Sequence, residues 1–273
     1  MRVCVCVKNV RTVRMPPRGL KALVKKTAPG KLVGEGKFKG YQATDQGQKV
    51  GRKLKGITKR LHDRVFSDGT LPIIARRADH RPGGHWAGRN GGRTRGSKVD
   101  AQVTRIVNSG PSAMKQIQHT YKLTKLTFAA LSAKKLEPVV AQRVVMARTK
   151  RLATAADIVC YDREHNQLVV VELKCGFDHG RRAPAELRDG KACTMKAPMS
   201  RVPDCNLNRH LCQLAVTREL FLRERRTMEQ VAQLGVDTDV RGLLLYAADS
   251  GVELFELDEY WKKRAWKIAC ALG

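Results

Sequence analysis

The chain has 273 residues, of which 53 are Lys or Arg and 25 are Asp or Glu, giving a net charge of +28 at neutral pH. This charge indicates a polyanionic partner, because a basic chain that contacts phosphates releases their condensed counterions. No apolar run reaches the length of about 18 residues that a transmembrane helix needs, so we expect no membrane association. The length allows one domain of ordinary size with an additional arm.

The positive charge is concentrated at the start of the chain. Residues 1–100 hold 25 Lys/Arg and 6 Asp/Glu, whereas the other 173 residues hold 28 and 19. The first acidic residue is Glu35, and short basic blocks recur among glycines without a sustained apolar period. We therefore predict a basic, largely disordered N-terminal arm over residues 1–92, attracted to phosphates, and a folded domain over residues 93–273.

Two helical patterns open the predicted domain. The first starts near Arg95 and ends at the stop signal Asn-Ser-Gly-Pro of residues 108–111, and its apolar positions are Val99, Val103, Ile106 and Val107. The second has apolar residues along one side, at Met114, Ile117, Tyr121, Phe128 and Leu131. Both patterns predict amphipathic helices that cover a core.

Three strand patterns follow. The first covers Glu137–Val145, the second contains Asp157, and the third ends with Glu172 and Lys174. Residues 168–171 are continuously apolar, which is typical of a strand buried on both faces. Downstream, the sequence predicts a helix over residues 206–217, two short strands over residues 242–246 and 252–257, and a last helix over about residues 258–270.

The charged residues at the end of the third strand require a physical reason. Side chains alternate along a strand, so Glu172 and Lys174 project from the same face. A divalent metal held by Asp157 and Glu172, with Lys174 beside the water that attacks a phosphate, would provide that reason. Hard oxygen ligands favour Mg²⁺ or Mn²⁺ over zinc. Taken alone the pattern is weakly specific, because many strands that end in solvent would match it.

The spacing Asp157…Glu172-Leu173-Lys174 resembles the PD-(D/E)XK nuclease superfamily, with Ala156 in place of the proline. Two helices followed by three strands is also the element order of that superfamily. Residues 95–257 look like its RecB and lambda-exonuclease branch, which is also found in large DNA viruses. The resemblance implies an α/β fold with a restriction-endonuclease-like core, in which a mixed central β-sheet is flanked by helices.

The resemblance also implies the roles of the site residues. Asp157, Glu172 and the carbonyl of Leu173 would hold Mg²⁺ (or Mn²⁺). Lys174 would orient or polarise the nucleophilic water. These residues form the expected catalytic and metal-binding centre.

Two further motifs of this branch are altered here. Its Gly-x-x-x-His appears as Gly96 followed by Asp100, and its Gln-x-x-x-Tyr appears as Gln213 followed by Thr217. Asp100 is either an additional metal ligand or a residue that favours the first turn of its helix. Gln213 is expected to hold the attacking site in register, and the alternative is that it satisfies backbone groups beside the sheet. Gln142 lies near a position where relatives often carry an acid, or is an edge polar residue.

We therefore expect a magnesium-dependent deoxyribonuclease that processes DNA ends, in an exonuclease-like manner, in replication, recombination or repair of a viral genome. Endonuclease activity and single-stranded or RNA substrates stay open. The main alternative is a catalytically inactive protein that keeps the nuclease fold as a nucleic-acid-binding scaffold. A third interpretation is a basic virion or chromatin-packaging protein whose arm is the functional part.

The eight cysteines contain no Cys-x-x-Cys pair, so we expect no zinc ribbon. Reduced thiols in an intracellular compartment are the simpler interpretation. The basic clusters are compatible with nuclear entry, which we favour. The acid-free start of the chain is compatible with a mitochondrial presequence, which is the alternative.

Overall fold

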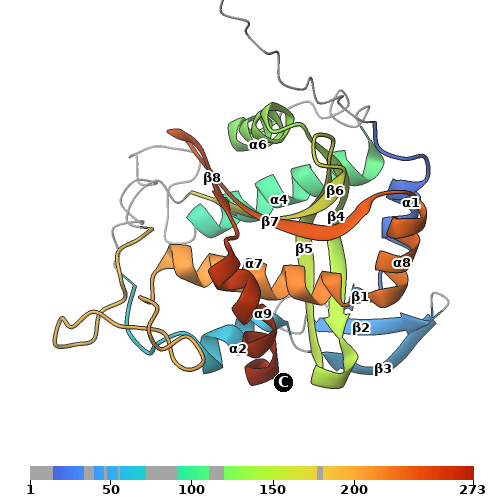
Figure 1. The fold of residues 1–273 in the computed structure, drawn as a ribbon. Helices are drawn as coiled ribbons and strands as arrows, with labels where there is room; N and C mark the ends of the chain where they lie inside the picture. Colours follow the sequence, from blue (N-terminus) through green and yellow to red (C-terminus); the bar gives the residue numbers. More distant parts are fainter. Residues whose placement is uncertain are drawn as a thin grey trace, which may run out of the picture.

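A five-stranded mixed sheet forms the centre of the molecule (Figure 1). The computed structural model describes residues 15–33, 40–45, 48–54, 56–71, 91–110, 120–176 and 181–273. In spatial order the strands are β4 (Leu136–Ala147), β5 (Leu152–Asp162), β6 (Gln167–Cys175), β7 (Asp237–Ala248) and β8 (Gly251–Glu256). The β6–β7 pair is parallel, and the other neighbouring pairs are antiparallel.

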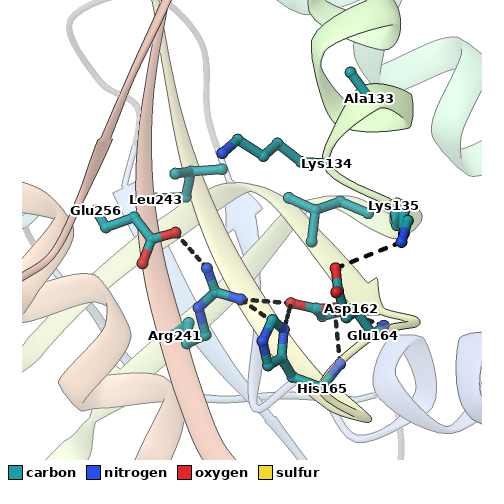
Figure 2. Close-up of a pocket in the computed structure, with 10 residues that line it drawn as sticks. Ala133, Lys134, Lys135, Asp162, Glu164, His165, Arg241, Leu243 and Glu256 are labelled. Carbon is teal, nitrogen blue, oxygen red and sulfur yellow. Dashed lines mark hydrogen bonds and ion pairs between the residues drawn. The ribbon is translucent and has the colours of Figure 1, made fainter. Parts of the chain in front are cut away.

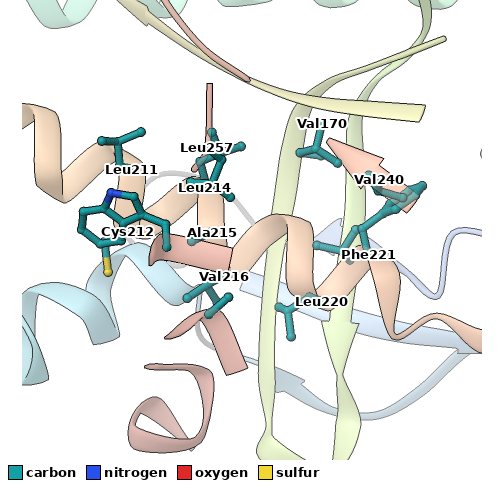
Figure 3. Close-up of a cluster of buried hydrophobic side chains, with 14 of the residues drawn as sticks. Val170, Leu211, Cys212, Leu214, Ala215, Val216, Leu220, Phe221, Val240 and Leu257 are labelled. Carbon is teal, nitrogen blue, oxygen red and sulfur yellow. The ribbon is translucent and has the colours of Figure 1, made fainter. Parts of the chain in front are cut away.

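Helices cover both faces of this sheet and bury two separate apolar clusters. On one face lie α1 (Leu20–Lys26), α2 (Ile57–Arg64), α7 (Asn206–Leu222), α8 (Arg225–Gln233) and α9 (Glu259–Leu272). Figure 3 shows the part of this cluster around α7. The other face is covered by α4 (Gly91–Ser109) and α6 (Lys122–Ala133). The expected class, an α/β fold with a mixed sheet flanked by helices, is confirmed.

The helices on both faces of the sheet explain why β6 is continuously apolar over residues 168–171. Leu168 and Val170 pack in the cluster under α7, whereas Val169 and Val171 pack in the cluster under α4. A strand with helices on both faces needs apolar residues at every position, not at alternate positions. β6 is therefore the central strand of the sheet, and charged residues at its end stand out from their surroundings.

Most predicted elements between residues 95 and 270 are present. α4 ends at Ser109, at the predicted stop signal, and starts at Gly91 rather than near Arg95. α6 starts at Lys122, and Met114 and Ile117 of the predicted second helix lie outside the described residues. α8 was not predicted. No helix in the described part of the chain has the length and apolarity to cross a membrane.

The prediction of a largely disordered arm over residues 1–92 is wrong where the structure describes that segment. Besides α1 and α2 it forms a three-stranded antiparallel sheet of β1 (Gly30–Val33), β2 (Gly40–Asp45) and β3 (Gln48–Leu54). Leu20, Val24, Ile57 and Leu61 are at most 1 % exposed and belong to the cluster under α7. Each helix contributes one short apolar stripe among many lysines and arginines, so the composition concealed it. These helices share the core of the domain predicted for residues 93–273.

Candidate active site

Asp157 and Glu172 meet where β5 and β6 stop pairing. The ladder ends with Ile158 opposite Val171, so the next position of the same antiparallel register places Asp157 opposite Glu172. Residues directly opposite each other in an antiparallel pair project from the same face. On the other neighbour of β5, the register places Gln142 opposite Asp157. Three polar residues therefore lie side by side on adjacent strands.

Asp157 is fixed by two hydrogen bonds. Its Oδ2 accepts from the backbone N–H of Leu173 at 2.9 Å, and its Oδ1 accepts from Nε2 of Gln142 at 3.3 Å. Where the two strands separate, the backbone N–H of Leu173 thus donates to the side chain of Asp157 and not to a backbone oxygen of β5. Burial raises the pKa of Asp157, although the charge of Lys174 and these hydrogen bonds oppose the effect.

Gln142 connects Asp157 to α4. Its Nε2 also donates to Oδ1 of Asp100 at 2.9 Å, so one amide nitrogen bridges two carboxylates. The backbone of Gln142 is left-handed, with φ of 54°, a conformation that costs a residue with a Cβ roughly 1–2 kcal/mol. Such local strain persists only where surrounding contacts enforce it. Here the acids hold the side chain of Gln142, and the side chain of Asn108 bonds both backbone groups of the preceding Ala141, at 3.1 and 3.0 Å.

Glu172 is the most buried acid of the site, with 1 % of its side chain exposed. Its Oε1 accepts from Nζ of Lys174 at 2.5 Å and from Nε2 of Gln213 at 2.6 Å. Its Oε2 is buried without a hydrogen-bond partner among the described residues. Burial, together with the charge of Asp157, raises the pKa of Glu172 to about 7, although Lys174 opposes this shift. An unsatisfied buried carboxylate oxygen is costly and marks a position that a cation would stabilise.

Lys174 carries a positive charge into this cluster. Its side chain is 19 % exposed, and burial alone would lower its pKa. The carboxylates of Glu172 and Asp157 outweigh that effect, so the pKa of Lys174 is raised. The ammonium group is therefore protonated at neutral pH and can donate hydrogen bonds, but it cannot accept a proton.

α7 contributes Gln213 and, one turn earlier, His210. Nδ1 of His210 lies 2.7 Å from the hydroxyl of Tyr246, the β7 residue in register with Lys174. Burial and the charges of Lys174 and Arg209 hold the pKa of His210 well below its usual value, so the ring is neutral at pH 7. The hydroxyl of Thr217, at the tyrosine position of the resembled motif, donates to the backbone of Gln213 at 2.9 Å. Thr217 thus bonds within its own helix.

The oxygen atoms of this site suit a hard divalent cation. Asp157, Glu172 and Asp100 bring three carboxylates against one ammonium group, and Oε2 of Glu172 lacks a partner among the described residues. The carboxylates are nevertheless spaced by Gln142 and Lys174, and in the described part of the chain no three His, Cys, Asp or Glu side chains are grouped to hold a metal. Leu173 joins the site through its N–H. A role for its carbonyl stays a prediction.

Tyr41 of β2 is a residue of this region that sequence reasoning missed. Burial raises the pKa of its phenol, hydrogen bonds from Thr154 and Ala155 oppose the shift, and the charges of Asp157 and Glu172 add to it. The small N-terminal sheet therefore reaches the neighbourhood of the acids. One tyrosine in a basic segment read as disordered gave no signal that could have identified it.

A cavity lies at the β5–β6 turn, where Asp162 is five residues along β5 from Asp157, roughly 17 Å away. Its volume is about 380 Å³, and Figure 2 shows Arg241 at its centre. Arg241 forms ion pairs with Asp162, at 2.5 Å, and with Glu256. Because its charges compensate one another, this cavity has less reason to take a charged ligand than the site around Glu172.

The fold and the site together define an α/β protein with paired carboxylates and a lysine at one end of its central sheet. Comparison of the sequence with models of known protein families and with curated proteins finds no match.

Proposed function

We propose that this protein is a metal-dependent nuclease that hydrolyses DNA phosphodiester bonds, with a PD-(D/E)XK-type core. The observation that carries the proposal is the arrangement around Glu172. Asp157 lies opposite it, Lys174 and Gln213 donate to one of its oxygens, and the other oxygen has no partner among the described residues. Opposed acids beside a protonated lysine are suited to phosphodiester hydrolysis.

Each residue has a distinct role in this proposal. Asp157 and Glu172 hold Mg²⁺ or Mn²⁺, with Asp100 and the carbonyl of Leu173 as further ligands. The metal, when bound, lowers the pKa of its water and neutralises charge that develops on the phosphate. Lys174 orients the attacking water by donating a hydrogen bond, since its raised pKa prevents it from acting as a base. Gln213 fixes the carboxylate of Glu172, and Gln142 sets the spacing of Asp100 and Asp157.

The surroundings of the site support a nucleic-acid strand as substrate. Arg181 stacks over the ring of Tyr246 at 4.8 Å, and Arg182 lies 5.8 Å from the ring of Phe255. Tyr246 is in register with Lys174, so Arg181 lies near the acids, and Arg182 lies farther out over β8. Arg181 is also paired with Glu253, so the net charge of +28 and Arg182 are what favour contact with a phosphate backbone. We propose that the substrate is a DNA end, in viral replication, recombination or repair inside the nucleus.

The test is cleavage of labelled linear and circular DNA with Mg²⁺ or Mn²⁺ against EDTA. We expect metal-dependent cleavage by the wild-type protein, faster on linear DNA, and at least a hundredfold loss in Asp157→Asn and Lys174→Ala. Glu229→Gln, which neutralises an exposed acid on α8, is the matched control. Cleavage that survives in Asp157→Asn would exclude this site as the catalytic centre.

A second candidate function rests on a specific observation. Lys174 and Gln142 already donate hydrogen bonds to the carboxylates of Glu172, Asp157 and Asp100, as expected if the fold serves as a metal-free nucleic-acid-binding scaffold. A scaffold would bind DNA tightly and salt-sensitively, would not cleave it, and would show no Mn²⁺-dependent rise in melting temperature.

A further inference from the structure

A small cavity of about 160 Å³ lies between α4, α6 and the β7–β8 turn. Its lining residues are Arg95, Val99, Tyr121, Lys122, Leu123 and Asp249. Val99 and Leu123 form its apolar wall, and the polar groups belong to two basic residues, a tyrosine and one acid. The cavity is thus a confined space with a positively charged lining.

Arg95 is the buried charge of this cavity. Its side chain is only 9 % exposed, and its Nη2 lies 2.5 Å from Oδ1 of Asp249, whose side chain is 54 % exposed. A buried guanidinium group needs an anion, because leaving it uncompensated is costly. Here that anion belongs to the exposed turn that joins β7 to β8. An exposed side chain can leave the pair and be hydrated by water, whereas the buried Arg95 cannot.

Lys122 adds a second donor at the same place. Its Nζ donates to the backbone oxygen of Asp249 at 3.0 Å. Lys122 is also the first residue of α6, whose first turn contains no acidic residue, so the positive end of that helix contributes to the local potential. One phosphate group, with several acceptor oxygens, could accept from Arg95 and Lys122 together in place of Asp249.

The cavity is close to the acids of the proposed active site. Asp100 follows Arg95 by five residues on α4, which is about 7.5 Å along the helix axis. The charges of Arg95, Asp100 and Asp157 all act on Cys175, the last residue of β6. Arg95, Asp100 and Asp157 therefore lie near the same end of β6.

We propose that this cavity is a phosphate subsite for the nucleic-acid strand, and that Asp249 occupies Arg95 until a substrate phosphate displaces it. The position of this phosphate next to the scissile bond rests on the proposed nuclease function. Phosphate binding at the subsite does not depend on whether the protein cleaves DNA. The subsite binds a strand that places a backbone phosphate next to Arg95. A ligand without such a phosphate does not displace the carboxylate of Asp249.

The experiment measures binding of a fluorescently labelled single-stranded oligonucleotide in EDTA, so that cleavage plays no part. Asp249→Asn should bind about two- to fivefold more tightly than wild type, because the competing carboxylate on the exposed side of the ion pair is removed. Arg95→Gln should bind more weakly, with a salt slope smaller by about 0.7. The gain from Asp249→Asn should disappear in the Arg95→Gln background. Glu229→Gln, on α8, controls for the loss of one exposed negative charge.

A gain that persists in the Arg95→Gln background, or that Glu229→Gln reproduces, would show that Asp249 acts only by general repulsion and would overturn the subsite. A second measurement leaves Arg95 intact, in case its replacement unfolds the protein. Inorganic phosphate should displace the oligonucleotide at a lower concentration from Asp249→Asn than from Glu229→Gln, and equal concentrations would overturn the proposal. These binding results, together with no cleavage in the separate assay with Mg²⁺ or Mn²⁺, would support the subsite on a scaffold and reject the nuclease function.

Discussion

The ammonium group of Lys174 lies 2.5 Å from Oε1 of Glu172, while Oε2 of the same carboxylate has no partner among the described residues. The lysine therefore satisfies one side of a buried acid and leaves the other side open. Burial and the charge of Asp157 raise the pKa of Glu172 despite this lysine, so the cluster still carries excess negative character. A divalent cation would compensate the remaining charge.

Replacing Lys174 by Met should therefore destabilise the protein in EDTA and increase its response to metal. Loss of the ammonium group leaves Glu172 buried with only Gln213 as donor, which should cost about 2–4 kcal/mol of unfolding free energy. Mn²⁺ can replace the missing charge, so its effect on the melting temperature should be larger in Lys174→Met than in wild type.

Thermal unfolding in 1 mM EDTA (about that concentration suffices to remove contaminating metal) and in excess Mn²⁺ measures both effects. The matched control is Lys196→Met, because Lys196 pairs with the exposed Asp68 at 2.8 Å, away from the acids. Equal metal shifts in wild type, Lys174→Met and Lys196→Met would contradict a metal site at Glu172.

Substitutions of Gln142 should change the free energy of unfolding and the affinity for Mn²⁺ in different ways. Its left-handed backbone favours glycine, so Gln142→Gly should be more stable than Gln142→Ala by about 1 kcal/mol, as measured by urea unfolding. Both variants lose the amide that joins Asp100 to Asp157, and both should bind Mn²⁺ more weakly in calorimetry. Equal stability of the two variants would mean that the backbone relaxes when the bridge is lost.

Much of the sheet and its helices was predictable from the sequence, because helical and strand periods are strong between residues 95 and 257. The alternation of β6 already placed Glu172 and Lys174 on one face, and the structure joins them directly. Gln213 was expected at the site from the resembled motif on the predicted helix over residues 206–217, and in the structure its amide contacts Glu172. These contacts follow from local periodicity combined with the order of the elements.

Other parts of the site depend on long-range contacts that leave no local pattern. The role of Gln142 depends on a positive φ and on an acid 42 residues away. Tyr41 reaches the acids through a small sheet whose strands carry many lysines and glycines. α8 has only Thr227, Met228 and Val231 as buried residues, too few to distinguish it from a loop. The basic composition of residues 1–92 concealed α1 and α2 for the same reason.

Arg143 shows how the N-terminal segment is held, and it gives a direct test that α1 belongs to the domain. Its fully buried guanidinium donates to the backbone oxygen of Val24 at 2.7 Å and to Oε2 of Glu224 at 2.6 Å. Arg143→Met leaves Glu224 buried without its cation and should cost about 3–5 kcal/mol. Adding Glu224→Gln should recover part of that loss in urea unfolding, because no uncompensated charge is left.

Proteolysis adds a local readout to this prediction. With the contact to Val24 lost, α1 should detach, and trypsin should cut at Lys25 or Lys26 faster in Arg143→Met than in wild type. Arg225→Met is the matched control, because Arg225 forms an exposed ion pair with Glu229 at 3.0 Å on the neighbouring helix. Unchanged cleavage at both lysines would mean that other contacts hold α1.

Asp204 should make the protein sensitive to acid. Its carboxylate is fully buried and accepts from Arg209 at 2.5 Å and from the backbone N–H of Ser67 at 2.5 Å. Burial alone would raise the pKa of Asp204, but these hydrogen bonds outweigh it and lower the pKa below its usual value. A depressed carboxyl pKa stabilises the fold above the unfolded-state pKa of about 3.9, and this stability is lost as pH falls through the folded-state pKa.

Asp204→Asn should therefore be less stable than wild type by about 2–3 kcal/mol at neutral pH, where the charged hydrogen bonds are complete. The difference should be nearly constant from about pH 7 to pH 5. It should shrink as the pH falls from about 4, the unfolded-state pKa, through the lower folded-state pKa at which Asp204 of the native protein becomes protonated. Urea unfolding at several pH values measures it, with Asp63→Asn as control because Asp63 is an exposed partner of Lys59. A difference that stays constant into acid would mean that the carboxylate contributes through packing, not through its charge.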